Sequence, residues 1–225
     1  MWYLSWEQEA PGSQPDSAWL SCEEHKHEYT KPKPNHQENT DPTYRINKHA
    51  KVTISATSFS YCLVDRDSPS SSTLQFGDAE QPAVTAPLLR SPRTNTFYYV
   101  GLSGISVGGQ ALSIPSSAFA MDDAGSGGVI VDSGTAVTRL QSGAYAALRE
   151  ASVQVRAVAR RFEGGGELKL PAKNYLIPVD GAGTYCLAFA GTSGAVSIIG
   201  NVQQQGVRVS FDTAKNTVGF TTDKC

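Results

Sequence analysis

GGVIVDSGTAVTRL, residues 127–140, decides how the rest of this sequence is interpreted. A run of glycine and β-branched residues leads to one carboxylate, Asp132, at the start of a Ser-Gly-Thr turn. Such a run predicts a buried strand that ends in a tight turn. Gly134 lets the backbone turn sharply and bring N–H groups to the carboxylate, while the Thr135 hydroxyl can brace the loop. The pattern therefore predicts a rigidly held carboxylate at the end of a strand.

A carboxylate held in this way suits peptide hydrolysis by a pair of aspartates. Two close carboxylates cannot both ionise, so they share a proton: one acts as a base towards water and the other as an acid towards the carbonyl. On the motif alone a simple Asp-Gly turn stays open as an alternative, because D-[ST]-G tripeptides occur by chance in many loops. The sequence contains one such motif, at Asp132.

The composition excludes some classes of partner and leaves the pairing of the cysteines open. The 225 residues carry a net charge of −2, and no apolar stretch approaches the length of about 18 residues that a membrane helix needs. We therefore expect no nucleic-acid and no membrane partner. The four cysteines are Cys22, Cys62, Cys186 and Cys225. Their wide spacing favours disulfides and an oxidising compartment, but four cysteines allow three pairings and the sequence does not choose among them.

Short strand candidates, separated by Gly, Pro, Asp or Asn, fill the sequence from about Thr57 onward. The stretch 96–109 is predicted as two strands that meet near Gly104. The other candidates are SFSYCLV, TLQFG, the strand before Asp132, GELKL, NYLIPV, TYCLAFA, AVSIIG, VRVSFD and TVGFT. Regular short strands with turn signals between them predict a mainly β lobe, a sandwich or barrel.

The segment 142–162 differs from the rest, because its apolar residues recur at spacings of three and four. Ser142 is a suitable N-cap for a helix that begins there. We predict a helix over residues 142–151. Residues 152–161 fit a helix or a strand equally well.

The first part of the chain has a different composition. All three Trp and all four His fall within its first 50 residues, together with the polar run HKHEYTKPKPNHQENTDP. Such a run buries too little apolar area to offset its ordering entropy, so residues 1–57 are predicted to be largely disordered. Cys22, His25 and His27 form a C-x-x-H-x-H group, but a closed zinc site needs four ligands and no second cluster follows. We expect no metal and no cofactor. The N-terminus has neither the basic start nor the apolar core of a signal peptide.

From about Ser58 the sequence resembles the C-terminal lobe of pepsin-type aspartic proteases, in their plant nepenthesin-like branch. The matching stretches occur in the family's order and cover most of residues 58–225: FSYCLVDRDS, FYYVGLSGISVGG, GGVIVDSGTAVTRL, NYLIPV, YCLAF, SIIGNVQQQGVRVSFD and VGF before a terminal Cys. The resemblance implies a single pepsin-like lobe at residues 58–225, half of the acid-protease β-barrel or sandwich. It would carry one short helix and follow an unrelated segment at 1–57.

The resemblance also implies roles for single residues. Asp132 stands at the second catalytic aspartate of the family, and Ser133, Gly134 and Thr135 form its loop. Ile198, Ile199 and Gly200 match the segment that passes behind this loop and supports it. Cys62 and Cys225 would bridge the start and the end of the lobe.

The sequence departs from the family pattern in three ways. The N-terminal lobe, with its own aspartate and flap tyrosine, is absent from this chain. Relatives have a few tens more residues between AYAALREA and SVQV, including a cysteine that would pair with Cys186, which is therefore expected to be unpaired. The junction also leaves Arg156 and Arg160 where relatives more often carry Pro or an apolar residue.

Three functional hypotheses follow. The first is an aspartic endopeptidase relative that acts on a polypeptide substrate and needs a second aspartate, from a separate N-terminal lobe or from a homodimer. The second is a non-catalytic binding module of the xylanase-inhibitor type. The third is a truncated gene product that folds poorly. Relatives are typically secretory, and the sequence leaves the compartment of this chain open.

Overall fold

The computed structural model describes most of the chain from Ala56 onward. The described residues are 56–65, 68–77, 81–154, 157–222 and 225. The predicted disorder of residues 1–57 concerns a segment that lies, apart from Ala56 and Thr57, outside them.

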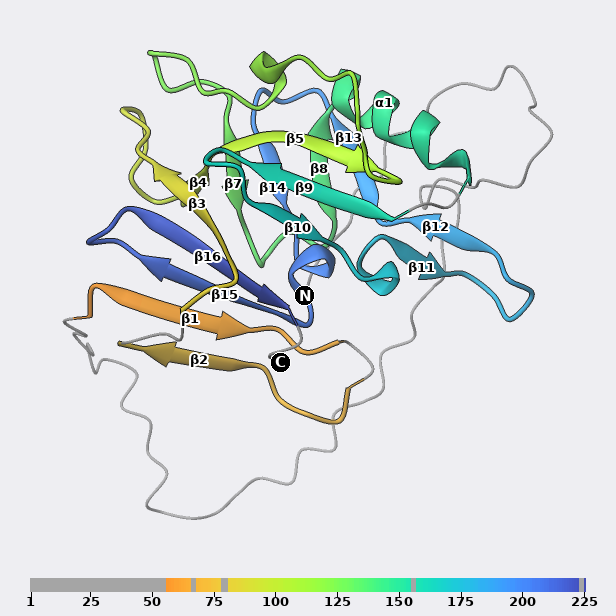
Figure 1. Cartoon of the computed structure of the whole chain (residues 1–225), viewed down its shortest axis with the longest axis horizontal. Helices are drawn as coiled ribbons and strands as arrows, with labels where there is room; N and C mark the ends of the chain where they lie inside the picture. The colour runs from red at the N-terminus through yellow and green to blue at the C-terminus, as the bar shows by residue number, and fades with distance from the viewer. Residues whose placement is uncertain (1–55, 66–67, 78–80, 155–156, 223–224) are drawn as a thin grey trace, which may run out of the picture.

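Strands dominate the described residues, which confirms the prediction of a mainly β fold (Figure 1). A ten-stranded sheet has the order β13 (Phe189–Thr192), β8 (Thr138–Gln141), β14 (Ser197–Ile199), β7 (Val129–Val131), β4 (Tyr99–Val100), β3 (Val84–Leu89), β16 (Thr217–Thr222), β15 (Val207–Asp212), β1 (Ser58–Cys62) and β2 (Thr73–Phe76). A four-stranded sheet has the order β10 (Glu167–Lys169), β9 (Val158–Phe162), β5 (Leu102–Val107) and β6 (Gln110–Ala111). A separate pair consists of β11 (Leu176–Pro178) and β12 (Tyr185–Leu187).

The core lies between the two larger sheets. In Figure 1, β5, β9 and β10 cross in front of β7, β14 and β8. Phe162 of β9 stacks on Phe220 of β16 with ring centroids 4.8 Å apart, so aromatic rings join the small sheet to the large one. Val100, Leu148 and Val209 are fully buried in the same cluster. Burial of such side chains stabilises the lobe by about 1.5–3 kcal/mol each.

The helix prediction is confirmed and its cap is corrected. Helix α1 spans Ser142–Ala151, but Gln141 is the N-cap residue and the Ser142 hydroxyl donates to the carbonyl of Thr192 instead. Ser142 therefore connects α1 by a hydrogen bond to β13, against which the helix packs. The ambiguous residues after the helix form a short 3-10 turn, Ser152–Gln154, followed by β9. Residues 158–162 form a strand and not a helix because β9 pairs with β5 on one side and with β10 on the other.

Several strand predictions need correction. Strands β6 and β8 were not predicted, and the candidate TYCLAFA divides into β12 and β13, which belong to different sheets. The strands within 96–109 meet at Gly101, between β4 and β5, and not near Gly104. A Cβ at Gly101 would lie 2.5 Å from Glu163 Oε2 and 2.9 Å from Pro87 Cγ, so neighbouring side chains fill the space that a larger residue would need. Strand β3 was not among the predicted strands, because Pro87 and the turn residues around it are unfavourable in strands. Pro87 lies opposite Thr217 of β16, and its carbonyl accepts the N–H of Gly101.

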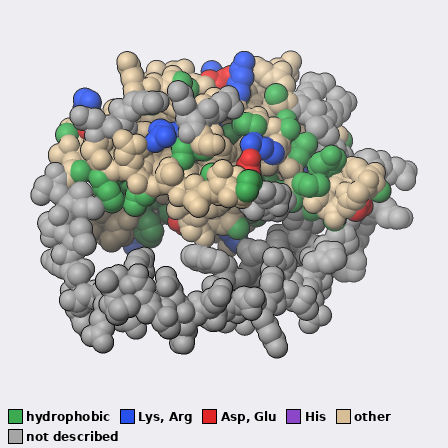
Figure 2. Space-filling view, turned by 90° about the horizontal axis from the view of Figure 1, so that it is seen from below, with side chains coloured by type: hydrophobic (Ala, Val, Ile, Leu, Met, Phe, Trp, Pro, Cys, Tyr) green, Lys and Arg blue, Asp and Glu red, His purple; other side chains and the backbone are tan. Residues whose placement is uncertain are grey.

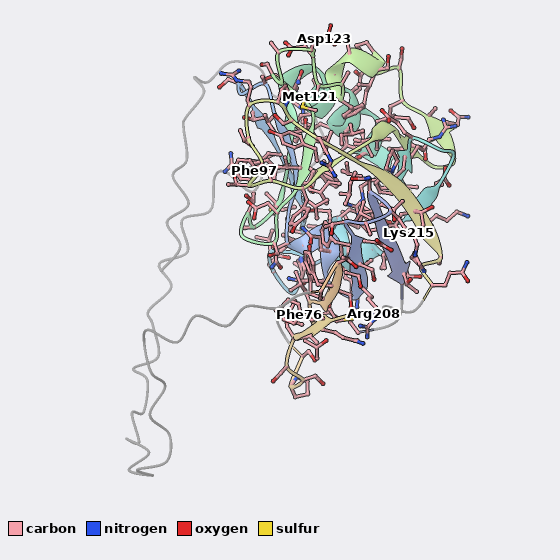
Figure 3. All side chains as sticks on the ribbon, turned by 90° about the vertical axis from the view of Figure 1, so that its left-hand side faces the viewer. Phe76, Phe97, Met121, Asp123, Arg208 and Lys215 are labelled. Carbon is pink, nitrogen blue, oxygen red and sulfur yellow. A yellow bond between two sulfur atoms is a disulfide. The ribbon has the colours of Figure 1, made fainter. Side chains whose placement is uncertain are left out.

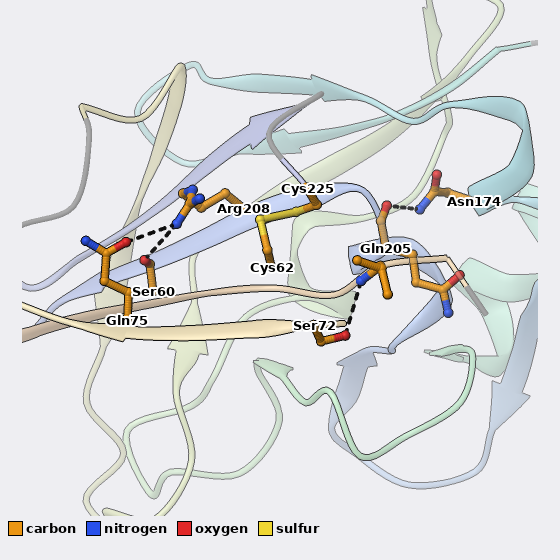
Figure 4. Close-up of a disulfide and its surroundings, with 9 residues drawn as sticks. Ser60, Cys62, Ser72, Gln75, Asn174, Gln205, Arg208 and Cys225 are labelled. Atoms are coloured by element: carbon orange, nitrogen blue, oxygen red, sulfur yellow. Dashed lines mark hydrogen bonds between the residues drawn. A yellow bond between two sulfur atoms is a disulfide. The ribbon is translucent and has the colours of Figure 1, made fainter. Parts of the chain in front are cut away.

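The start and the end of the lobe are joined covalently. Cys62 of β1 and Cys225 form a disulfide with their Cα atoms 5.3 Å apart, as the resemblance implied (Figure 4). Beside it, Arg208 donates to Ser60 Oγ and Gln75 Oε1, both at 3.4 Å. Cys186 is buried and has no disulfide partner among the described residues, to which Cys22 does not belong.

Candidate active-site half around Asp132

Three short strands position the Asp132 loop. Strand β14 lies between β7 and β8 and runs parallel to β7, with Ile199 opposite Val131. All three residues of β7 are buried, which explains the apolar run before the aspartate. Asp132 therefore leaves the end of a central strand that is fixed on both sides.

The carboxylate of Asp132 is held by its own loop. The Gly134 N–H donates to Oδ1 at 2.8 Å, and the Thr135 hydroxyl donates to Oδ2 at 2.7 Å. The backbone N–H of Asp132 donates to the Ile199 carbonyl at 3.1 Å. The residue is partly exposed, and Ser133 and Gly134 are exposed. Two donors thus fix the direction of the carboxylate, which remains accessible from outside the lobe.

The residues after β14 hold the other side of the loop. The Asn201 N–H donates to the Thr135 carbonyl at 2.7 Å, and the Asn201 side-chain amide donates to the Ser133 carbonyl at 3.0 Å. The Val202 N–H donates to the Ala136 carbonyl at 3.0 Å. Ser133 and Thr135 are thus bonded to Asn201, which directly follows the predicted support residues Ile198, Ile199 and Gly200.

The predicted support residues differ in how they act. Ile199 is 1% exposed and holds Asp132 through its carbonyl. Ile198 is partly exposed and pairs with Ile130 and Arg139. Gly200 packs against the backbone of β8 and its N–H donates to Thr138 Oγ1 at 3.0 Å. A Cβ at Gly200 would lie 2.6 Å from the Val137 carbonyl oxygen, so only glycine fits.

Gly200→Ala should therefore destabilise the lobe, because the new methyl group would displace the backbone of β8. We expect the free energy of unfolding to fall by about 1–3 kcal/mol. The matched control is Gly143→Ala in α1, where a Cβ meets nothing within 4 Å. The control should stabilise the helix by up to about 1 kcal/mol. Urea denaturation of both variants checks the prediction, and equal effects in the two would contradict it.

Two buried glutamines next to this segment were not assigned a role from the sequence. Gln203 and Gln204 are fully buried. Gln203 Oε1 accepts the Thr138 N–H at 2.9 Å, and Gln203 Nε2 donates to the carbonyls of Asn174, at 2.9 Å, and Ala188. The available signal was the run of three glutamines after SIIGNV, since amide side chains beside a strand core are buried only where they are bonded.

Arg160 is a buried cation without a carboxylate partner among the described residues. Its Nη2 donates to the Gln203 carbonyl at 3.1 Å and its guanidinium lies 5.7 Å from the centroid of the Phe220 ring. Nε and Nη1 have no hydrogen-bond partner within the described part of the chain. Burial lowers the pKa of Arg160 from 12.5 to about 10. A buried charge with so few partners opposes folding.

Arg160→Met should therefore raise the free energy of unfolding, by about 1–4 kcal/mol near neutral pH. The matched control is Arg161→Met, because Arg161 is the exposed neighbour, and its effect should stay within about 0.5 kcal/mol. Above pH 10 the folded wild type loses the Arg160 proton before the unfolded chain does. The stability of the wild type then rises relative to that of Arg160→Met, so the difference between their free energies of unfolding becomes smaller. Denaturation at several pH values checks this, and a destabilised Arg160→Met would contradict it.

The described residues contain no group of three or more metal-ligating side chains. His25, His27 and Cys22 lie outside them. None of the described helices is long and apolar enough to cross a membrane.

Comparison with known proteins identifies the lineage. The family model described as Xylanase inhibitor C-terminal matches residues 97–160 and 150–222. Protein ASPARTIC PROTEASE IN GUARD CELL 2 of Arabidopsis thaliana is 43% identical over 196 residues, which cover 74% of this chain and 42% of that protein. Aspartyl protease family protein 2 of the same plant is 46% identical over 198 residues, 74% of this chain and 41% of that protein. Aspartic proteinase nepenthesin-1 of Nepenthes gracilis is 34% identical over 206 residues, 76% and 46% of the two chains.

Solved structures agree on the fold. The crystal structure of edgp matches with a TM-score of 0.62 at 18% identity, over 74% of this chain and 54% of that one. Basic 7S globulin from soybean matches with a TM-score of 0.59 at 19% identity, over 74% and 52%. The chain spans about two fifths of the length of the first two Arabidopsis relatives. It belongs to the plant nepenthesin-like branch of the pepsin-like aspartic proteases and corresponds to their C-terminal lobe.

Proposed function

We propose that residues 58–225 supply one half of an aspartic endopeptidase active site, with Asp132 as one of its two catalytic carboxylates. The observation that carries the proposal is the pair of hydrogen bonds that Gly134 and Thr135 donate to the two oxygens of Asp132. Each oxygen accepts one bond from the described residues, whereas a carboxylate group offers about four acceptor sites. Acceptor sites therefore remain for a water molecule and for a shared proton. Ser133 and Gly134 complete the loop.

The reaction needs a second carboxylate opposite Asp132. With two carboxylates and one proton between them, the ionised member takes a proton from water while the protonated member donates to the peptide carbonyl. This chain contains a single D-S-G motif. We propose that an N-terminal lobe outside these 225 residues supplies the second aspartate, and a second copy of this chain is the alternative.

Exposed aromatic side chains on the lobe, some of them next to the Asp132 loop, support a partner lobe. The Val131 N–H donates to the Tyr98 carbonyl at 3.0 Å, which places Phe97 and Tyr98 next to the Asp132 loop. Phe97 is 51% exposed, and Phe76 on the edge strand β2 is 48% exposed. Figure 3 shows both along the left-hand border of the described lobe, and Figure 2 shows hydrophobic side chains gathered in patches on the face seen from below. A partner that covers such side chains gains about 25 cal/mol per Å² of apolar surface.

Cleavage of a denatured protein at acid pH, with and without a pepstatin-type inhibitor, tests the proposal. The chain is assayed alone over a range of concentrations and after mixing with the N-terminal lobe of a nepenthesin-like relative. We expect inhibitor-sensitive cleavage in the mixture. Cleavage by the chain alone that rises with the square of its concentration would assign the second aspartate to a second copy. Absence of inhibitor-sensitive cleavage under every condition would overturn the proposal.

A second candidate function, a non-catalytic binding module, is favoured by the match to the xylanase-inhibitor family model. In this case the exposed loops of the lobe would contact a microbial glycan-degrading enzyme. The test is inhibition of a xylanase by the chain, with Asp132→Asn as the control. Inhibition that is equal for wild type and variant would support binding without catalysis, and absence of inhibition would exclude it for the enzymes tried.

A further inference from the structure

We propose that Tyr61 and Gln204 are positioning residues for Asp132, connected to it through the carbonyl of Ile199. The catalytic consequence of this inference rests on the proposed function, whereas the structural coupling does not. The three residues belong to different parts of the chain: Tyr61 to β1, Gln204 to the 3-10 turn after β14, and Asp132 to the loop after β7.

The Ile199 carbonyl is the point at which these parts meet. It accepts the backbone N–H of Asp132 at 3.1 Å and the side-chain amide of Gln204 at 2.8 Å. A carbonyl oxygen has two lone pairs, and here both are used. Any turn of the Gln204 amide therefore changes the acceptor that fixes the direction in which Asp132 leaves its strand.

Tyr61 fixes the Gln204 amide. The Tyr61 hydroxyl donates to Gln204 Oε1, while Gln204 Nε2 donates to Ile199. The Ile199 carbonyl can only accept, so it requires the NH2 end of the amide. The Tyr61 hydroxyl donates to the other end and holds the amide in this orientation. Gln204 is fully buried, so loss of the Tyr61 hydroxyl would leave a buried amide oxygen without this donor, which is unfavourable.

The fold anchors Tyr61 independently of the Asp132 loop. Tyr61 pairs with Val209 of β15 and with Leu74 of β2, and its ring lies 6.0 Å from that of Phe211. Burial and then the negative charge of Asp132 raise the pKa of Tyr61 far above its usual value of 10.0. The phenol therefore stays protonated and keeps its hydrogen for Gln204 Oε1.

Loss of this connection should alter Asp132 more than it alters the fold. Catalytic groups must lie within a fraction of an ångström of their productive positions, and misplacement by about 1 Å can cost about 100-fold in rate. We expect Tyr61→Phe and Gln204→Leu to lower kcat about 10-fold or more in the two-lobe mixture, with little change in KM. We expect KM to change little because substrate binding depends on other surfaces and because the Asp132 side chain remains present.

Nuclear magnetic resonance of the full chain, labelled with 15N, tests the coupling without any need for activity. In Tyr61→Phe and Gln204→Leu the Asp132 N–H signal should shift and its hydrogen exchange should accelerate about 10-fold or more. The matched control is Tyr175→Phe, which removes a hydroxyl from another buried ring outside this series of hydrogen bonds. It should leave the Asp132 signal unchanged. Gln204→Glu should restore the signal at acid pH, where a protonated carboxyl can donate to Ile199 and accept from Tyr61.

The outcomes separate this inference from the proposed function. An unchanged Asp132 signal and unchanged kcat in folded Tyr61→Phe and Gln204→Leu overturn the positioning role, even if Asp132→Asn is inactive. A shifted signal in a chain that never cleaves peptides supports the positioning role and overturns the proposed function. If Gln204→Leu does not fold, Tyr61→Phe decides alone, since it removes one oxygen atom. An equal shift in Tyr175→Phe also overturns the inference.

Discussion

Asp132→Asn should abolish inhibitor-sensitive peptide cleavage by the chain mixed with an N-terminal lobe, with a loss of at least about 1,000-fold in kcat/KM. An amide can neither take a proton from water nor share one with a second carboxylate, so the acid–base pair is lost. The substitution keeps the shape of the side chain. Its carbonyl oxygen can still accept the Gly134 N–H, and the Thr135 hydroxyl can rotate to bond the new amide. The free energy of unfolding should therefore change little.

Asp123→Asn is the matched control for this variant. Asp123 is an exposed aspartate of the same lobe, so removal of its charge should leave cleavage unchanged (Figure 3). Progress curves for wild type and both variants, with and without the inhibitor, give the comparison. Retention of inhibitor-sensitive activity in Asp132→Asn would show that Asp132 is not one of the two carboxylates.

Removal of the Cys62–Cys225 disulfide should produce the largest loss of stability. The bond closes a loop with a sequence separation of 163 residues, nearly the whole lobe. On the chain-entropy model a loop of this size stabilises the folded state by about 5 kcal/mol, because the bond restricts the unfolded chain. Folded domains have only about 5–15 kcal/mol of stability in total. The double variant Cys62→Ser/Cys225→Ser should therefore unfold at a much lower urea concentration than the oxidised wild type.

Cys186→Ala is the control for the disulfide variant. Cys186 is buried in β12, so its loss removes a small apolar side chain and, among the described residues, no crosslink. Its effect should be far smaller than that of the double variant. Equal urea midpoints for oxidised wild type and double variant would contradict the prediction. Absence of a cooperative transition in the wild type would favour the hypothesis of a poorly folding gene product.

Much of the fold was predictable because its signals are local. The apolar run before Asp132 predicts β7, and the spacing of Tyr145 and Leu148 predicts α1. The cap at Ser142 was wrong because that hydroxyl bonds β13, a contact between residues 50 positions apart. Strand β3 was missed because Pro87 conflicts with the local rules for strands, and only pairing with β16 and β4 overrides them.

The candidate site likewise has a local part that the sequence predicted and a long-range part that it did not predict. Asp132, Ser133, Gly134 and Thr135 were predicted, because adjacent residues make the loop and its hydrogen bonds. Tyr61 and Gln204 were not assigned to the site, since their hydrogen bond joins residues separated by 143 positions. A phenol and an amide carry no signal of this kind until the sheet brings them together. The burial of Arg160 likewise depends on how β9 packs against β16.

Binding of a pepstatin-type inhibitor, measured by calorimetry at acid pH, tests the central claim most directly. The claim is that this chain contributes Asp132 to a carboxylate pair completed by another lobe. The account predicts one inhibitor bound per pair of lobes, weak or undetectable binding to either lobe alone, and loss of tight binding in Asp132→Asn. Tight binding that is unchanged by Asp132→Asn would contradict it.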